Sequence, residues 1–470
     1  MLVDIVFLIL LGYNSEQIVS LQREIMKKNI ILSMILVASL NAQDLKTTIS
    51  ELINTNPTIL ERLNNYEATK QDIDTAFADY YPKLDLNLGL GYEKTDKSNL
   101  PRTPSTSSED FNVYQNSLKY THNIFRGFNT MYQVEGQEYR SISAAYSYVE
   151  KVNNTSFTLV NNYLELMKNQ ELLGTAKRNV EIDQEIFVKV KKLYNAGLTT
   201  LSEVNKIESS LALAKSNLVV QENTILDSSY NLQRTLGKEL NPQEMIKPTL
   251  KIAIPETKEE ALEYAIKNNP SLLVSDYNIK LAQATKKEKE SPFYPKIDIE
   301  VSQSMNKNLS AIQGDEDRFR AMAYLSYNIF NGFADTASLQ KSKSAVFQEL
   351  ETQRSIRRQI LEGLNLAWAA NTKLTEQLKY LVEYKDFSYK TLTLYSKEYD
   401  LGRRSLLDLL SAQNDYIKSK AQIISTEYSL LYAQYRILDA MGLLVPSIIG
   451  DETLVYSAVE LKKNPQNEDK

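Results

Sequence analysis

The sequence lacks the residues on which most catalytic and metal sites depend. Its 470 residues include no cysteine and one histidine, His122. The absence of cysteine excludes disulfides, thiolate metal sites and cysteine nucleophiles. A single histidine argues against a histidine-based zinc site or a Ser-His-Asp triad, and no glycine-rich loop precedes Lys-Ser or Lys-Thr. We therefore expect no catalytic residues, no metal, no cofactor and no enzyme activity. The net charge of −5 also argues against a nucleic-acid partner.

The N-terminus has the pattern of a secretory signal peptide. Met26 begins a basic Met-Lys-Lys segment, residues 30–40 are apolar, and Ala42 is a small residue at the cleavage point. We expect translation to start at Met26 and the signal region, residues 1–42, to be removed after Ala42. The alternative is that residues 1–25 are a genuine N-terminal anchor. Later in the chain no apolar run reaches the ~18 residues of a spanning helix, so any membrane segment must consist of strands closed into a barrel.

The second half of the chain repeats the first. Asn-Pro at residues 56–57 recurs at 269–270, and Tyr-Pro-Lys at 81–83 recurs at 294–296, both 213 residues later. Ile-Phe-x-Gly-Phe at 124–128 recurs at 329–333, 205 residues later. A single change of offset indicates one insertion in a surface loop. We predict two repeats, residues 43–256 and 257–443, followed by a polar C-terminal tail over 444–470.

Each repeat has the same predicted order of elements. A helical stretch, at about 44–80 and 257–290, ends at the Tyr-Pro motif, because proline stops a helix and is compatible with the start of a strand. The predicted strands span about 82–93, 113–125, 295–305 and 318–330. The predicted long helices span about 130–194 and 335–399, and the returning helices span 201–236 and 406–441. At 1.5 Å per residue each long helix is a rod of about 100 Å.

The strands have one apolar face. Leu84, Leu86, Leu88, Leu90 and Tyr92 alternate with small or polar residues, as in a barrel with an aqueous lumen. Four strands per chain cannot close a membrane barrel, because known ones need at least eight. The chain must therefore assemble with copies of itself, and the strand count leaves a dimer, a trimer and a tetramer open.

The duplicated halves, the Asn-Pro, Tyr-Pro-Lys and Ile-Phe-x-Gly-Phe motifs, and glycines at 197 and 402 between the long helices resemble the TolC family over residues 44–443. The resemblance implies a mainly α protein with transmembrane β structure. Long coiled-coil hairpins would form an α-helical barrel continuous with a β-barrel to which each protomer contributes four strands. It further implies a homotrimer in the cell outer membrane, in contact with lipid and extending into the periplasm. The implied partners are a periplasmic adaptor (membrane fusion) protein and an inner-membrane ABC or RND transporter.

Within that family, residues 291–300 and 401–414 resemble the branch that serves type I protein secretion, which includes LapE-like and agglutination-protein-like members. This second resemblance implies a passive exit duct for polypeptides. One alternative is the exit duct of a small-molecule pump for drugs or metals. An alternative of another class is a structural periplasmic coiled-coil protein without a channel.

The resemblance also implies functional residues at the turns between the long helices. Equivalents of Glu203, Tyr399, Arg404 and Asp408 form the periplasmic gate of the family. The turns at Gly197 and Gly402 would be the places where the adaptor docks.

Each of these positions also has a purely structural interpretation. Thr200-x-x-Glu203 and Ser405-x-x-Asp408 are capping-box sequences, in which the acid binds a free backbone N–H at a helix start. Tyr399 could serve helix packing, and the two glycines could serve only the turn conformation.

Overall fold

The computed structural model describes residues 44–97, 107–250, 254–308, 314–451 and 453–461. The predicted signal region, residues 1–42, lies outside them. The first repeat contains helices α3 (Leu45–Thr55) and α4 (Pro57–Phe77), the 3-10 turn η1 (Ala78–Tyr80), strands β1 (Lys83–Lys97) and β2 (Ser107–Arg126), and helices α5 (Asn129–Asn195) and α6 (Leu201–Leu236). The second contains helices α7 (Lys258–Asn268) and α8 (Pro270–Glu288), the turn η2 (Ser291–Phe293), strands β3 (Lys296–Lys307) and β4 (Asp315–Ser326), and helices α9 (Ala334–Asp400) and α10 (Leu406–Ala440). Helices α11 (Leu444–Ile449) and α12 (Leu454–Ser457) follow.

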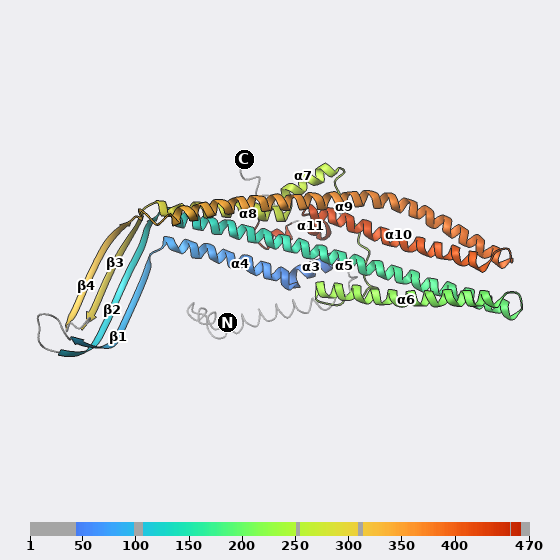
Figure 1. The fold of residues 1–470 in the computed structure, drawn as a ribbon, viewed down its shortest axis with the longest axis horizontal. Helices are drawn as coiled ribbons and strands as arrows, with labels where there is room; N and C mark the ends of the chain where they lie inside the picture. Colours follow the sequence, from blue (N-terminus) through green and yellow to red (C-terminus); the bar gives the residue numbers. More distant parts are fainter. Residues whose placement is uncertain (1–43, 98–106, 251–253, 309–313, 452, 462–470) are drawn as a thin grey trace, which may run out of the picture.

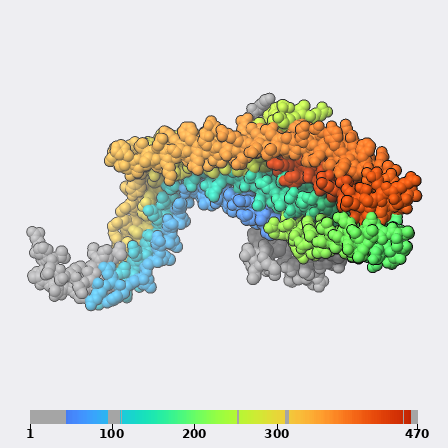
Figure 2. Space-filling view, turned by 45° about the vertical axis from the view of Figure 1, so that its right-hand side comes forward, coloured from blue at the N-terminus to red at the C-terminus, as the bar shows by residue number. Residues whose placement is uncertain are grey.

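The molecule is a long helical rod with a sheet at one end. Helices α5 and α9 run along the rod, and α6 and α10 return beside them from the opposite end (Figure 1). The space-filling view shows the sheet bending away from the rod axis (Figure 2). This architecture confirms the expected mainly α fold with long hairpins and four strands per chain. None of the helices in the described ranges is both long enough and apolar enough to cross a membrane.

The four strands form one antiparallel sheet in the order β1-β2-β3-β4. Its apolar face is exposed in the protomer: the side chains of Leu84, Leu86, Leu88 and Leu90 are 65–77% exposed. A soluble sandwich would bury this face, because exposed apolar patches of this kind are rare on soluble monomers. The exposed face is the one expected to meet lipid.

The helical stretches that precede the strands are interrupted at the Asn-Pro motifs, between α3 and α4 and between α7 and α8. The stretches predicted as single helices over 44–80 and 257–290 are each two helices, because Asn56 and Asn269 have extended backbones (ψ 122° and 124°). Each asparagine ends one helix, and its side chain accepts a hydrogen bond from the second residue of the next helix. The following proline stands at the first helical position, where its missing N–H is not needed.

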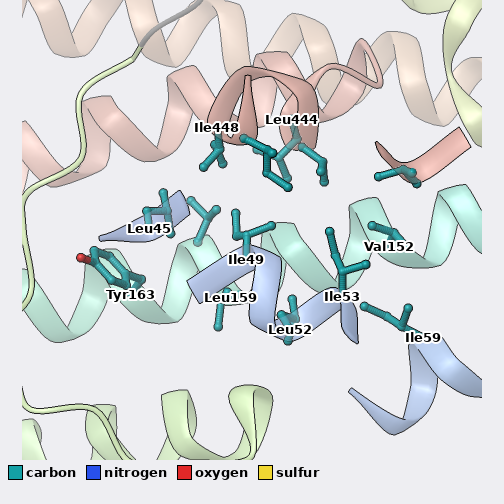
Figure 3. Packing of buried hydrophobic residues seen from close by; sticks show 14 of the residues in the cluster. Leu45, Ile49, Leu52, Ile53, Ile59, Val152, Leu159, Tyr163, Leu444 and Ile448 are labelled. Carbon is teal, nitrogen blue, oxygen red and sulfur yellow. The ribbon is translucent and has the colours of Figure 1, made fainter. Parts of the chain in front are cut away.

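The main core lies half-way along the rod. Residues from α3, α4, α5 and α11 meet there, including Ile49, Leu52, Leu159 and Leu444, none of which is solvent-exposed (Figure 3). The core also contains residues of α10, among them the buried Tyr435.

The C-terminal prediction was wrong for residues 444–461. Instead of continuing as a polar tail, the chain folds back as α11 and α12 against the core. Val445, Ile448 and Val455 are buried there. Their apolar side chains stabilise the fold-back, since each buried residue of this type contributes about 1.5–3 kcal/mol. The rest of the predicted tail, residues 462–470, lies outside the described residues.

Candidate functional site

The two helical hairpins of the protomer pack together at their tips. This tip cluster is a set of buried apolar residues separate from the main core. It contains Val190 from α5, Val204 and Ile207 from α6, Tyr399 from α9, and Leu406, Leu409 and Leu410 from α10. All four long helices contribute, so the cluster fixes the position of one hairpin tip against the other.

Tyr399 is the polar member of the tip cluster. Its side chain is 8% exposed, and its hydroxyl has no hydrogen-bond partner in the described part of the protomer. Burial raises the pKa of Tyr399 to about 12, and the negative charges of Glu203 and Asp400 add to the effect. The hydroxyl therefore stays protonated at physiological pH.

An ion pair joins the hairpins next to this ring. Lys189 on α5 pairs with Asp400, the last residue of α9. The ammonium of Lys189 also lies 5.6 Å from the centroid of the Tyr399 ring, within the range of a cation–π contact. The corresponding residues of the other repeat, Leu394 and Asn195, cannot form such a pair. The ion pair therefore belongs to the contact between the two hairpins of one chain, and the duplicated sequence does not repeat it.

Glu203 and Asp408 both lie in the first turn of a returning helix. The hydroxyls of Thr200 and Ser405 accept hydrogen bonds from the backbone N–H groups of these two acids, at 3.4 and 3.2 Å. This half of the predicted capping box is present in both hairpins. The carboxylates, however, accept from hydroxyls: Glu203 from Thr199, and Asp408 from Ser405 at 2.8 Å. Both acids are therefore at least partly engaged in their own hairpin.

Arg404 is held within the second hairpin. Its Nε donates to Glu398 at 2.7 Å, and its guanidinium lies 4.2 Å from the centre of the Tyr395 ring. The structure thus brings Tyr399 and Glu203 near each other at the tip without a hydrogen bond between them. It joins Arg404 and Asp408 only to neighbours on their own hairpin.

The turns themselves have left-handed glycines. Gly197 and Gly402 have φ of +74° and +68°, and an added Cβ would meet no atom within 4 Å at either position. Each helix ends with the hydrogen-bond pattern of a Schellman motif, such as Leu198 N–H to the Leu193 carbonyl at 2.9 Å. Leu198 and Leu401 beside the glycines are 74% and 69% exposed. Both turns are thus open protrusions at the end of the rod, each with an exposed leucine beside its glycine.

Sequence reasoning missed a polar network behind the tips. Asp183 on α5 is 2% exposed, and its carboxylate accepts hydrogen bonds from Gln413 at 2.6 Å and Ser210 at 3.1 Å. Burial raises the pKa of Asp183. The network links α5, α6 and α10. No sequence motif marks this network, but a comparison of the two repeats could have indicated it. Asp183 and Ser210 correspond to Ser388 and Asp415, so the acid lies on the long helix in the first repeat and on the returning helix in the second.

Comparison with known proteins identifies the family. The family model for outer membrane efflux proteins matches residues 48–238 and 261–443, most of both repeats. The chain belongs to the outer membrane efflux protein family.

Within the described residues, no group of three or more acidic or histidine side chains could hold a metal.

Individual relatives are distant in sequence but similar along most of the chain. The outer membrane efflux protein BepC of Brucella suis is 19% identical over 393 residues, which are 83% of this chain and 84% of BepC. The cation efflux system protein CusC of Escherichia coli K12 is 20% identical over 410 residues, 84% of this chain and 86% of CusC.

Solved structures share the fold. The outer membrane channel CmeC of Campylobacter jejuni has a TM-score of 0.76 at 12% identity and covers 90% of each chain. The outer membrane protein VceC of Vibrio cholerae has a TM-score of 0.72 at 14% identity, covering 85% of this chain and 96% of VceC.

Family membership determines the class of function. Outer membrane efflux proteins are transport ducts rather than enzymes, and they work as trimers with adaptor and inner-membrane transporter partners. They lie in the outer membrane and extend through the periplasm. The chain is therefore an outer-membrane efflux channel protomer. The alternative of a purely structural coiled-coil protein does not fit this membership.

Proposed function

We propose that three copies of this chain form the passive exit duct of a tripartite export system, and that the cargo is a polypeptide delivered by type I secretion. The main support for a duct is the combination of two 67-residue helices with an open-edged sheet at one end. Helices of that length run about 100 Å. A sheet with an exposed apolar face requires further strands and lipid around it.

The cargo assignment rests on two sequence stretches. Residues 291–300 contain the turn η2 and the start of β3, and residues 401–414 contain the second tip and the start of α10. Both stretches resemble the type I secretion branch. The second also contains Leu406, Leu409 and Leu410 of the tip cluster, so the resemblance includes the part of the tube that cargo enters first.

A small-molecule pump is the second candidate. Its support comes from the relatives, which include a cation efflux protein, a pyoverdine export protein and a toluene efflux protein. These names describe those proteins, and their identities to this chain are 20–22%.

Deletion of the gene distinguishes the two cargoes. Under type I secretion, the deletion strain should lose one or a few large proteins from the culture medium, and complementation should restore them. Its susceptibility to a panel of drugs, metals and solvents should stay unchanged. An unchanged extracellular protein profile together with increased susceptibility would favour the small-molecule pump.

We further propose that Glu203, Tyr399, Arg404 and Asp408 form the periplasmic gate in the trimer. A ring of three Asp408 carboxylates in a narrow neck would attract cations, because low-dielectric walls concentrate the potential. In planar bilayers, the purified trimer should then prefer cations, and Asp408→Ala should raise its conductance. Asp227→Ala, which removes an exposed acid far along α6, is the matched control. An Asp408→Ala channel with unaltered conductance and selectivity would remove this residue from the gate.

The start of α3 supports signal removal after Ala42. Asp44 is the N-cap of this helix, and its carboxylate accepts from the Thr47 N–H at 2.8 Å. The N-cap of this helix thus lies two residues after the proposed cleavage point. N-terminal sequencing of the protein purified from outer membranes should begin at Gln43. Any other start would relocate the cleavage site.

A further inference from the structure

A cavity lies beside the main core, where α3, the linker between the repeats and the C-terminal helices meet. It is lined by residues 44–46 at the start of α3, residues 246–250 of the linker, Tyr435 of α10, and Ser447 and Ile448 of α11. Two of these residues, Leu45 and Ile448, are seen at the edge of the core in Figure 3. The cavity volume is about 180 Å³. A cavity of about 150 Å³ can hold a benzene ring, so a small organic molecule fits here.

The hydroxyl of Tyr435 is a buried polar group in this cavity without a partner. The side chain is 2% exposed, and none of the described residues forms a hydrogen bond with its hydroxyl. Burial raises the pKa of Tyr435 to about 12, so the hydroxyl keeps its proton and can donate it to a hydrogen bond. Because an unpaired buried hydroxyl is unfavourable, Tyr435 indicates a ligand with a hydrogen-bond acceptor.

The start of α3 supplies further donors to the same cavity. Leu45 and Lys46 are the first two residues of this 11-residue helix, where backbone N–H groups have no helical partner. The Asp44 carboxylate does not serve them, because it accepts from the N–H and the hydroxyl of Thr47, at 2.8 and 2.7 Å. The positive end of the helix dipole favours an anion at this position.

The charged residues of the lining leave one cation without an acidic partner. Lys247 is paired with Glu427 at 2.6 Å. The negative charge of Asp44 lies at the positive end of the α3 dipole. Lys46 is exposed and forms no ion pair within the described part of the chain. The lining is therefore not strongly charged, and it favours a ligand with a single negative charge.

The second repeat does not form an equivalent cavity. Tyr230, the counterpart of Tyr435, is 62% exposed. Thr257, the counterpart of Asp44, caps α7 by accepting from the Glu260 N–H at 3.3 Å. The burial of Tyr435 is thus specific to the place where α11 folds back, and the exposed Tyr230 provides a matched control.

We propose that this cavity binds a small organic carboxylate that carries a short apolar group. The carboxylate accepts hydrogen bonds from the Tyr435 hydroxyl and from the first N–H groups of α3, close to the ammonium of Lys46. The apolar group packs against the rest of the lining, which includes Leu250 and Ile448. The carboxylate has two possible sources, a free short-chain acid and the carboxyl end of a peptide. The inference goes beyond the export function and does not depend on its cargo.

Isothermal titration calorimetry of the mature protein, purified in detergent, tests the site. The probes are butyrate for the free acid and N-acetyl-alanyl-alanine for the peptide end. Butyramide and N-acetyl-alanyl-alanine amide are the matched neutral probes. We expect a carboxylate to bind once per chain, with a dissociation constant of about 1 mM or lower for a ligand of this size. Its amide should bind at least about tenfold more weakly, because it lacks the charge that the donors favour.

The pattern of binding also identifies the source of the carboxylate. Tighter binding of N-acetyl-alanyl-alanine would support the proposal and assign a peptide end, and tighter binding of butyrate would support it and assign a free acid. Absence of binding by both carboxylates at ten times the expected dissociation constant would overturn the proposal. Equal binding of acids and amides would also overturn it.

Tyr435→Phe places the binding in this cavity. The variant should weaken carboxylate binding by about tenfold or more, because a hydrogen bond to a charged group contributes at least that factor. The apparent Tm of the ligand-free variant should equal or exceed that of the wild type, since the hydroxyl has no partner to lose. Tyr230→Phe is the control and should bind as the wild type does. Wild-type affinity in Tyr435→Phe would overturn the site.

Lys46→Ala tests the same site outside the core. Removal of this exposed charge should weaken carboxylate binding by up to about fivefold and leave the binding of the amides unchanged. Lys258→Ala, which removes a lysine from the first turn of the corresponding helix α7, is the control. A loss of affinity in Lys258→Ala as large as that in Lys46→Ala would overturn the placement of the carboxylate at α3.

Discussion

The side-chain amide of Asn56 donates a hydrogen bond of 2.9 Å to the backbone carbonyl oxygen of Thr235. Asn269 forms the same bond, also 2.9 Å long, with Ala440 in the second repeat. Thr235 and Ala440 lie at the ends of the returning helices α6 and α10, where carbonyl groups lack helical partners. The asparagine of each Asn-Pro motif therefore caps the start of one helix, α4 or α8. It also donates a hydrogen bond to a backbone carbonyl at the end of a returning helix.

Asn56→Ala should reduce the free energy of unfolding by about 1–3 kcal/mol, because it removes a helix cap and leaves a partly buried carbonyl without its partner. Asn56→Asp should lose less, since a carboxylate still caps Thr58 but cannot donate to Thr235. The apparent Tm of the purified protein in detergent measures both effects. Asn54→Ala is the control, since Asn54 makes only an exposed bond to Ser50. Equal losses for Asn54→Ala and Asn56→Ala would contradict this role.

Tyr399→Phe should leave the apparent Tm unchanged or raise it. The substitution keeps the buried ring and removes a hydroxyl without a hydrogen-bond partner, whose burial costs about 1–3 kcal/mol. Tyr399→Ala should instead lower stability by about 3–5 kcal/mol, as for other large aromatic residues in cores. A loss in Tyr399→Phe as large as that in Tyr399→Ala would mean that the hydroxyl is bonded in the assembled protein.

Most of the fold was accessible from the sequence because it is repeated. Two copies of the Tyr-Pro-Lys and Gly-Phe motifs mark the same boundaries twice, and β1 and β3 both begin at the lysine of this motif, Lys83 and Lys296. The break at Asn56 was not predicted, because the residues on both sides of the Asn-Pro motif are helical. The buried C-terminal segment was missed for a different reason. The four apolar residues of α11 are followed by a largely polar segment, and only tertiary packing assigns them to the core.

The contacts of the tip residues were harder to predict from the sequence. Resemblance pointed to Tyr399 and Arg404, but the Lys189–Asp400 pair depends on how two hairpins lie side by side. That arrangement follows from packing between residues about 200 positions apart, which local patterns do not encode.

Lys189→Glu should loosen the tips of the protomer, because it puts like charges at Asp400 and removes the cation from the Tyr399 ring. Both side chains of the pair are about half exposed, so the substitution should change the free energy of tip opening by about 0.2–1 kcal/mol. In planar bilayers this corresponds to a change in open probability of up to about fivefold. Adding Asp400→Lys should restore the wild-type value. Exchange of the exposed Lys373–Glu376 pair on α9 is the control. Failure of the double variant to recover would exclude the ion pair as the cause.

Asp183→Asn should change how stability depends on pH. Burial raises the pKa of Asp183, so the folded chain binds this proton more tightly than the unfolded chain does. Between the ordinary carboxyl pKa and the raised one, the contribution of Asp183 to stability therefore increases as the pH falls, and it is smallest above the raised value. Asp183→Asn should be at least as stable as the wild type at pH 7, with an advantage that narrows toward pH 4. Asp227→Asn is the control, and equal pH profiles for wild type and Asp183→Asn would contradict the prediction.

Gly402→Phe and Gly197→Phe should abolish export while leaving trimers intact. Both positions have open space for a side chain, so the protomer tolerates the ring at the cost of about 1–2 kcal/mol for the left-handed backbone. An adaptor docked on the turn would meet that ring. Gly237→Phe is the matched control, because Gly237 also ends a long helix, has φ of +87° and open space, and lies at the other end of α6. Export is measured as the extracellular protein profile of complemented deletion strains. Export that persists in Gly402→Phe, or that is lost equally in Gly237→Phe, would show that the tip turns are not docking sites.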